Sequence, residues 1–281
     1  MLNVVKSLLF RLKKSAMFWV MLGICVALPI FTLLLTEFVL NIANIFAPVT
    51  ADEIGLSDLV YITLSGLATP YSIANFLTLL CVSIFLCKEF SDGTIRNTLL
   101  SNKSRVQLYR AYALTALIIG GSFLVAYFVS TLLALGIPFG FGSATFGQWV
   151  ISCLTSLLLG LLSLVFVITC VLMFMFTTGK QSSSIILPLL VMVFLPNIIS
   201  SAVELISGLL YMIKMLAQNG SVDVPFDFFM DGSWIPLYNA TLFDASNVSL
   251  ALIGKISLYY ALFGGLFIFL GRLSAVKRDL K

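Results

Sequence analysis

The sequence predicts an all-α polytopic membrane protein with six transmembrane helices. Two observations on composition point to this class: hydrophobic residues make up 60% of the 281 residues, and charged residues only 10%. A soluble domain is about half apolar and a quarter charged. A chain of this length cannot bury so much additional apolar surface in one core. The third observation is that the apolar residues fall in stretches long enough to span a bilayer.

A spanning helix needs about 20 predominantly apolar residues. Six segments meet this requirement: Ala16–Leu40, Leu59–Leu86, Ala111–Ile137, Trp149–Phe176, Ser183–Ile199 and Leu250–Leu270. The fifth is short and contains Pro188 and Pro196, which predict an interrupted helix, with the apolar stretch Ala202–Leu216 as a separate piece. Residues 1–281 are expected to form a single transmembrane domain.

The basic residues predict the orientation, because loops rich in Lys and Arg stay in the cytoplasm. The two tails, the loop after the second span and the turn after the fourth together hold fourteen basic and three acidic residues, a net charge of +11. The opposite side holds two basic and nine acidic residues, a net charge of −7. Both termini are therefore expected in the cytoplasm of a multi-pass cell-membrane protein. The overall basic charge reflects topology and not a nucleic-acid-binding surface.

Three segments lie outside the predicted spans. Met1–Ser15 places leucines and valines at helical spacing between Lys6, Arg11, Lys13 and Lys14, which predicts a helix in the cytoplasmic interface. The second segment is the cytoplasmic loop Lys88–Arg110. The third is the external connection Ser200–Ser249, with an amphipathic start and an acidic, aromatic end.

The composition argues against several kinds of chemistry. The chain has no histidine, the commonest metal ligand and the usual proton carrier near neutral pH. Its five cysteines form no CxxC pair and are interpreted as small buried hydrophobic residues. Gly179–Lys180 lacks the glycine and the Ser or Thr that a phosphate-binding loop requires around such a pair. We therefore expect no nucleotide site, metal, cofactor or enzyme activity in this chain.

The loop Lys88–Arg110 has the pattern of a short amphipathic helix. Ser91 or Asp92 can cap it, and Ile95, Leu99 and Leu100 share one face. Ser104 can cap a further helix that leads into the third span. These residues alone leave two interpretations open: an interfacial loop and a docking site for a soluble partner.

The stretch Glu89-Phe-Ser-Asp-Gly-Thr-Ile-Arg, followed by Leu99-Leu100-Ser101 and Ser104-Arg105, resembles the first cytoplasmic loop of permease subunits in the type-2 ABC exporter family. The rest of the chain resembles that family in architecture only. In the family, this loop contains a coupling helix that fits a cleft on the ATPase subunit. The resemblance implies a coupling surface made of Glu89, Asp92, Gly93, Thr94, Ile95 and Arg96.

The resemblance also implies the partners and the function. They are a cytoplasmic ABC ATPase subunit that carries ATP and Mg, a second copy of the permease or a similar permease, and the lipid bilayer. The chain would then be the permease subunit of an ATP-driven exporter of an amphipathic or hydrophobic substrate, such as a peptide, an antibiotic or a lipid-like molecule. The family's re-entrant external helices would correspond to Ser200–Leu216 and part of the segment before Leu250. The acidic stretch Asp223–Asp244 is longer than in the family. Glu204, Pro188 and Pro196 are candidate substrate or gating residues.

Two other classes of function stay open. The chain could be a membrane sensor or immunity protein that binds an external peptide through its acidic loop without pumping it. It could also be a secondary transporter, although such proteins usually place charged residues near the centres of their spans. The first four predicted spans have none there.

Overall fold

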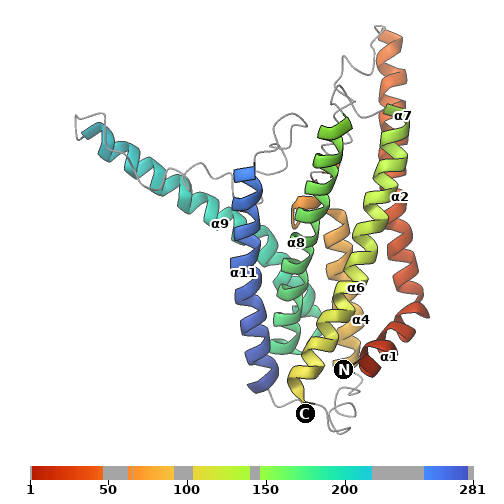
Figure 1. Ribbon diagram of the computed structural model, residues 1–281, viewed down its shortest axis with the longest axis vertical. Coiled ribbons are helices and arrows are strands. Elements are labelled where there is room, and N and C mark those ends of the chain that lie inside the picture. Colours follow the sequence, from red (N-terminus) through yellow and green to blue (C-terminus); the bar gives the residue numbers. More distant parts are fainter. Residues whose placement is uncertain are drawn as a thin grey trace.

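The computed structural model describes residues 2–46, 63–64, 66–91, 104–139, 146–216 and 250–277. All regular elements among these residues are helices, and six of them are long and apolar enough to cross a membrane. The long helices form a bundle along one common axis (Figure 1). The prediction of an all-helical chain with six helices of spanning length is confirmed.

The elements follow one another in antiparallel order. They are α1 (Leu2–Lys13), α2 (Ala16–Phe46), the 3₁₀ turn η2 (Gly66–Ala68), α4 (Ile73–Ser91), α6 (Arg105–Thr131), the π-helical turn η3 (Leu132–Gly136), α7 (Ile137–Phe139), α8 (Phe146–Thr178), α9 (Gln181–Leu216) and α11 (Leu250–Lys277). Elements α6, η3 and α7 follow one another without a break, and α6 with η3 makes one candidate span, Arg105–Gly136. Gly179, at a φ of 62°, forms the tight turn between α8 and α9.

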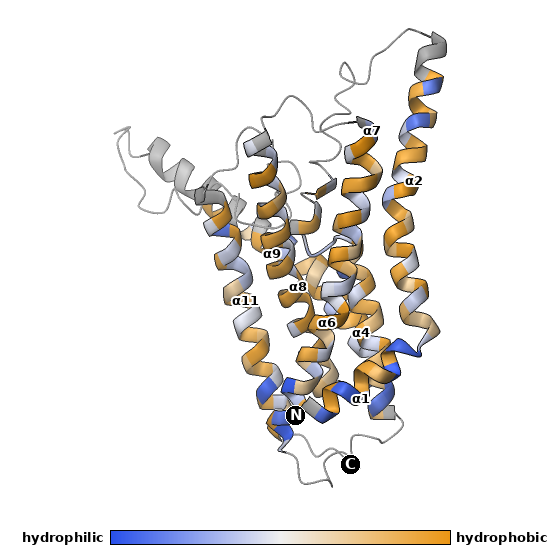
Figure 2. Cartoon of the chain, turned by 45° about the vertical axis from the view of Figure 1, so that its right-hand side comes forward, coloured by the Kyte–Doolittle hydropathy of each residue, from blue (hydrophilic) through white to orange (hydrophobic). Residues whose placement is uncertain are grey.

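Two helices form the centre of the bundle. In both α4 and α8, 61% of the most apolar window is buried, against 17% in α2, 22% in α9 and 28% in α11. Large apolar side chains therefore remain exposed on the peripheral helices, for example Phe31, Leu34 and Phe38 on α2. Figure 2 shows hydrophobic residues along most of α2 between its two ends. Such a surface suits a lipid environment, because a water-soluble protein rarely exposes large continuous apolar patches.

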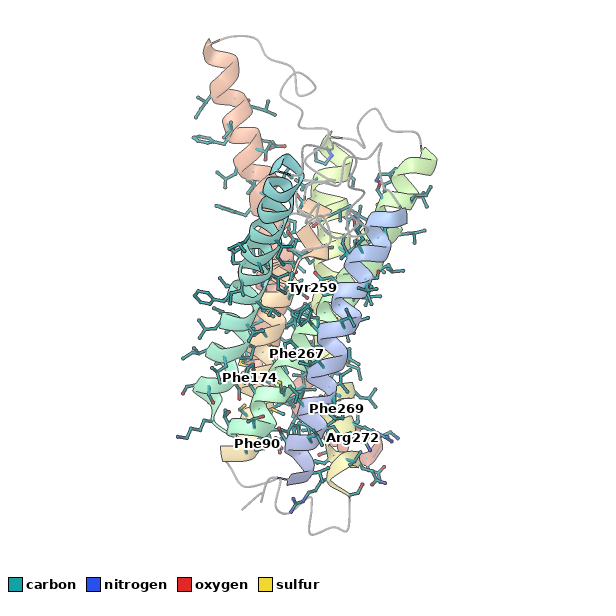
Figure 3. The ribbon with its side chains drawn as sticks, turned by 90° about the vertical axis from the view of Figure 1, so that its left-hand side faces the viewer. Phe90, Phe174, Tyr259, Phe267, Phe269 and Arg272 are labelled. Carbon is teal, nitrogen blue, oxygen red and sulfur yellow. The ribbon has the colours of Figure 1, made fainter. Side chains whose placement is uncertain are left out.

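Aromatic rings join α8 to α11. Phe166 of α8 lies 5.6 Å from the ring of Tyr260 and 5.6 Å from that of Phe267, measured between centroids. Tyr259 contacts the same phenylalanine at 6.1 Å. Figure 3 shows Tyr259 and Phe267 along α11. These spacings are those of favourable aromatic pairs, so they stabilise the contact between the two helices.

The second predicted span was too long at its start. The sequence predicted Leu59–Leu86, but α4 begins only at Ile73, after η2 and a turn. Pro70 lies in this turn, and the hydroxyl of Ser72 accepts a hydrogen bond from the backbone N–H of Asn75 at 3.2 Å, as a helix cap does. The apolar residues before the turn therefore do not extend α4.

The prediction that prolines interrupt the fifth span was wrong. Helix α9 continues through Pro188 and Pro196. A proline removes one backbone donor, so Pro188 leaves the carbonyl of Ser184 without its usual partner in the helix. The hydroxyl of Ser83 on α4 donates a hydrogen bond to this carbonyl at 2.9 Å. The neighbouring helix thus supplies the missing donor.

The separate helix predicted for Ser200–Leu216 was also wrong. These residues continue α9, whose second half leans away from the bundle (Figure 1). The remainder of the connection that the sequence predicts to be external, residues 217–249, lies outside the described residues.

Helix α1 is amphipathic, as predicted, and the structure shows where its apolar face lies. Val5, Leu8 and Leu12 are buried, and Leu12 belongs to the main hydrophobic core. α1 contacts the start of the third span, α6, and also α2. Its apolar face therefore packs on the bundle instead of remaining free for lipid.

Candidate functional site at the basic end of the bundle

Basic side chains gather at one end of the bundle, which we call the basic end. α1, the last turn of α4, the first turn of α6, the α8–α9 turn and the last turns of α11 meet there, and Figure 2 shows the hydrophilic residues concentrated at this end. The basic residues at this end whose side chains are described are Lys6, Arg11, Lys13, Lys14, Lys88, Arg105, Arg110, Lys180 and Arg272. The basic residues that the sequence predicts on one side therefore lie together in space, as far as the structure describes them.

Glu89 in the last turn of α4 forms an ion pair with Arg11 of α1. Its side chain is only 6% exposed, whereas that of Arg11 is 43% exposed. A carboxylate is buried at low free-energy cost only when it is paired. The pair therefore fixes the end of α4 to the N-terminal helix, immediately before the predicted coupling residues.

Aromatic residues hold the same end of α4 from its other side. The ring of Phe90 lies 5.4 Å from that of Phe176 on α8 and 6.3 Å from that of Tyr112 on α6. Tyr109 lies 5.3 Å from Phe176. Figure 3 shows Phe90 at the basic end. Three helices are thus packed together at the point where the chain leaves α4.

The start of α6 is fixed as firmly as the end of α4. Ser104 caps this helix, as predicted, by accepting a hydrogen bond from the backbone N–H of Gln107 at 3.3 Å. The Nη1 atom of Arg105 donates to the carbonyl of Val276 on α11 at 2.8 Å. The chain before residue 92 is therefore tied to α1, and the chain after residue 103 is tied to α11.

The structure places the predicted site residues in different parts of the chain. Asp92, Gly93, Thr94, Ile95 and Arg96 lie outside the described residues, so their role as a coupling surface stays a prediction. Glu89 is described, and its buried ion pair with Arg11 is a contact within the same chain. Glu204 belongs to α9, but its side chain lies outside the described ones.

The two candidate prolines lie away from Glu89. Pro188 and Pro196 are both buried, on the face of α9 that also carries Ser184 and Met192. The hydrogen bond at Ser184 joins this face to α4. The structure therefore connects the prolines to the centre of the bundle.

A polar cluster at the other end of α4 was not predicted. The amide nitrogen of Asn75 donates to the hydroxyl of Ser163 on α8 and to the carbonyl of Thr69, both at 2.9 Å. The Ser163 hydroxyl in turn lies 3.1 Å from the carbonyl of Leu67 in η2. Asn75 is 1% exposed. The one sequence signal for this cluster is an asparagine inside an apolar stretch.

An apolar groove runs between α2 and α6. It encloses about 700 Å³ and is lined by small and aliphatic residues: Val26, Gly121, Ser122, Val125, Ala126, Val129, Ser130 and Leu133. Its volume and lining suit a hydrocarbon chain or an apolar side chain of another helix.

The described residues contain no group of three or more His, Cys, Asp or Glu side chains that could hold a metal ion. All five cysteines are buried and unbridged, as expected for small core residues. No family model matches the chain, and no curated protein or solved structure matches it. The resemblance to type-2 ABC exporters therefore depends on the sequence motif and the architecture alone.

Proposed function

We propose that the chain is the transmembrane permease subunit of an ATP-driven exporter. The observation that carries this proposal is the place where α4 ends. Glu89 and Phe90, in its last turn at the basic end, are held by a buried ion pair and an aromatic cluster, and the predicted coupling residues Asp92–Arg96 follow them in the chain. Because basic residues mark the cytoplasmic side, this end is where a soluble ATPase and its ATP would be available.

In this proposal, the loop between α4 and α6 transmits motion from a cytoplasmic ATPase subunit. ATP and Mg are bound by that partner. Movement of the loop would act on α4 through its last turn and on α6 through its first. Arg11 and Arg105 would pass the displacement on to α1 and α11, because each arginine joins one side of the loop to another helix.

The surface of the bundle favours the proposal that the substrate is amphipathic or hydrophobic, such as a peptide, an antibiotic or a lipid-like molecule. The groove between α2 and α6 is apolar, and the peripheral helices expose large hydrophobic side chains. These exposed faces also leave room for a second copy of the permease or a similar permease. Substrate would enter from the cytoplasm or the inner leaflet.

The test compares the wild-type chain with Arg96→Ala. Each is tagged, expressed in its own host and purified in mild detergent, and ATPase activity is measured in the eluate with identification of the co-purifying subunit. We expect an ABC ATPase with wild type and a loss of tenfold or more with Arg96→Ala, as for an anchoring interface residue, about 1.4 kcal/mol or more. The matched control is Arg272→Ala, which removes an exposed arginine at the same end.

Membrane insertion must be unchanged in both variants. An ATPase that co-purifies equally with Arg96→Ala and wild type would contradict the proposed docking site. A purified wild-type chain with no ATPase partner would contradict the exporter itself. Binding of an external peptide without pumping would then favour a sensor or immunity protein, and transport driven by a proton or sodium gradient would favour a secondary transporter.

A further inference from the structure

The two faces of α1 differ sharply in chemistry. One face carries Val5, Leu8 and Leu12, which are buried against the bundle. With 100° between successive residues, Lys6, Phe10 and Lys13 lie on the opposite face, Lys14 follows in the turn directly after the helix, and all four are exposed. We call this exposed set the lysine face.

The lysine face has no acidic neighbour on its own helix, because α1 contains no Asp or Glu. Phe10 is 60% exposed, and the Nζ atom of Lys14 lies 4.4 Å from the centre of its ring. Just beyond, Trp19 is 53% exposed, and its indole N–H donates to the carbonyl of Lys13 at 2.9 Å. Cations together with exposed aromatic rings at the end of a transmembrane bundle match the headgroup level of a bilayer.

The packing of α1 changes what this helix can recognise. A free interfacial helix binds a membrane through its buried apolar face together with attraction between its cations and anionic lipids. In α1 that face is already occupied by the bundle, so the cations supply the contact with the membrane. Charge complementarity then favours anionic over zwitterionic lipid, by about fivefold for each lysine near the surface.

We propose that the lysine face is a binding surface for the headgroups of anionic phospholipids. It holds such lipids beside α1, the helix whose Arg11 pairs with Glu89 at the end of α4. This surface does not depend on an ATPase partner or on transport, so it is separate from the proposed exporter function.

The chain provides its own reporter for this surface. It has three tryptophans, and Trp149→Phe with Trp234→Phe leaves only Trp19. The purified single-tryptophan protein is placed in phosphatidylcholine vesicles that contain brominated phosphatidylglycerol or brominated phosphatidylcholine. Because bromine quenches only tryptophans that it contacts, the two quenching curves give the relative affinity of the Trp19 site for the two lipids.

We expect phosphatidylglycerol to be preferred by about fivefold or more, with a preference that falls as salt is added. Lys6→Gln with Lys13→Gln and Lys14→Gln should bring the preference close to one, whereas the same three positions changed to Arg should keep it. Arg272→Gln with Lys277→Gln removes two charges at the same end on α11 and should leave it unchanged.

Equal quenching by the two lipids in the parent protein would overturn the proposal. A preference that survives the three Gln substitutions would overturn it as well. Glycerol phosphate added in solution separates a membrane-bound headgroup from a free phosphate: it should not reduce the quenching, and strong competition would assign the surface to soluble anions. Since only protein and lipid are present, a preference in this assay excludes an acidic protein as its source.

Discussion

The two ends of α4 are fixed by different chemistry. At the basic end, Glu89 is paired with Arg11, whose side chain is nearly half exposed. At the opposite end, Asn75 is almost fully buried and is bonded only to neutral groups, the Ser163 hydroxyl and the Thr69 carbonyl. One end therefore relies on charge and the other on uncharged hydrogen bonds.

The difference follows from access to water. A charge removed from water loses several kcal/mol of hydration, which a partner restores only in part. Arg11 keeps part of its hydration because it lies at the edge of the bundle. Around η2, Leu67 and Thr69 are buried, and non-helical backbone at such places in a membrane protein is tolerated where the protein satisfies its polar groups. A neutral amide such as that of Asn75 does so without introducing a charge.

The largest effect is expected at the charged end. Arg11→Met removes the guanidinium that pairs with the buried Glu89, and we expect the free energy of unfolding to fall by about 2 kcal/mol, less than for a fully buried pair because Arg11 is partly exposed. Titration of the folded protein with SDS in mixed micelles measures this change.

The double variant Arg11→Met with Glu89→Met distinguishes the effect of losing the ion pair from the effect of losing the Arg11 side chain. It should recover most of the stability, because no unpaired carboxylate remains. If the double variant is as unstable as the sum of the two single variants, the ion pair does not carry the contact between α1 and α4. Added salt should weaken the wild-type pair only slightly, because Glu89 is shielded from solvent.

A smaller effect is expected at the neutral end. Asn75→Leu keeps the size of the side chain but removes the amide that donates to the Thr69 carbonyl and the Ser163 hydroxyl, leaving the Thr69 carbonyl only the longer bond from the Ser72 backbone N–H at 3.3 Å. We expect a loss of about 1–2 kcal/mol, the range for buried polar contacts between membrane helices. The same SDS titration measures it.

Asn197→Leu is the matched control for this end. Asn197 is exposed on α9, and its amide donates only to the carbonyl of Val193 in its own helix, at 2.6 Å. Its replacement should change stability by less than about 0.5 kcal/mol. Equal losses at the two positions would show that the Asn75 contacts do not stabilise the break before α4.

The sequence was sufficient for the features that depend on composition and period. Long apolar stretches predicted the six helices, the leucines of Met1–Ser15 predicted α1, and Ser104 was predicted as a cap. The distribution of lysine and arginine predicted the basic end. Each of these depends on residues close together in the chain, so one sequence contains the information.

The features that the sequence did not reveal depend on residues far apart in the chain. The partner of Glu89 is Arg11, on another helix, so an acid in a loop motif was not recognisable as a buried one. The role of Asn75 becomes apparent only from its hydrogen bond to Ser163, which lies on another helix. The coupling residues Asp92–Arg96 remain predictions, because they lie outside the described residues.

The smallest effect is expected for the hydrogen bond that joins the middle of α4 to α9 beside Pro188. Ser83 lies between the two ends of α4 and donates to the Ser184 carbonyl that Pro188 leaves without a partner. Ser83→Ala should lower the free energy of unfolding by about 0.6 kcal/mol, the average for a side-chain hydrogen bond between membrane helices. In a Pro188→Ala background, the backbone N–H of residue 188 can satisfy the same carbonyl. Ser83→Ala should then have almost no effect. An equal loss in both backgrounds would show that Ser83 contributes independently of Pro188, and would contradict its role as the donor that replaces the missing N–H.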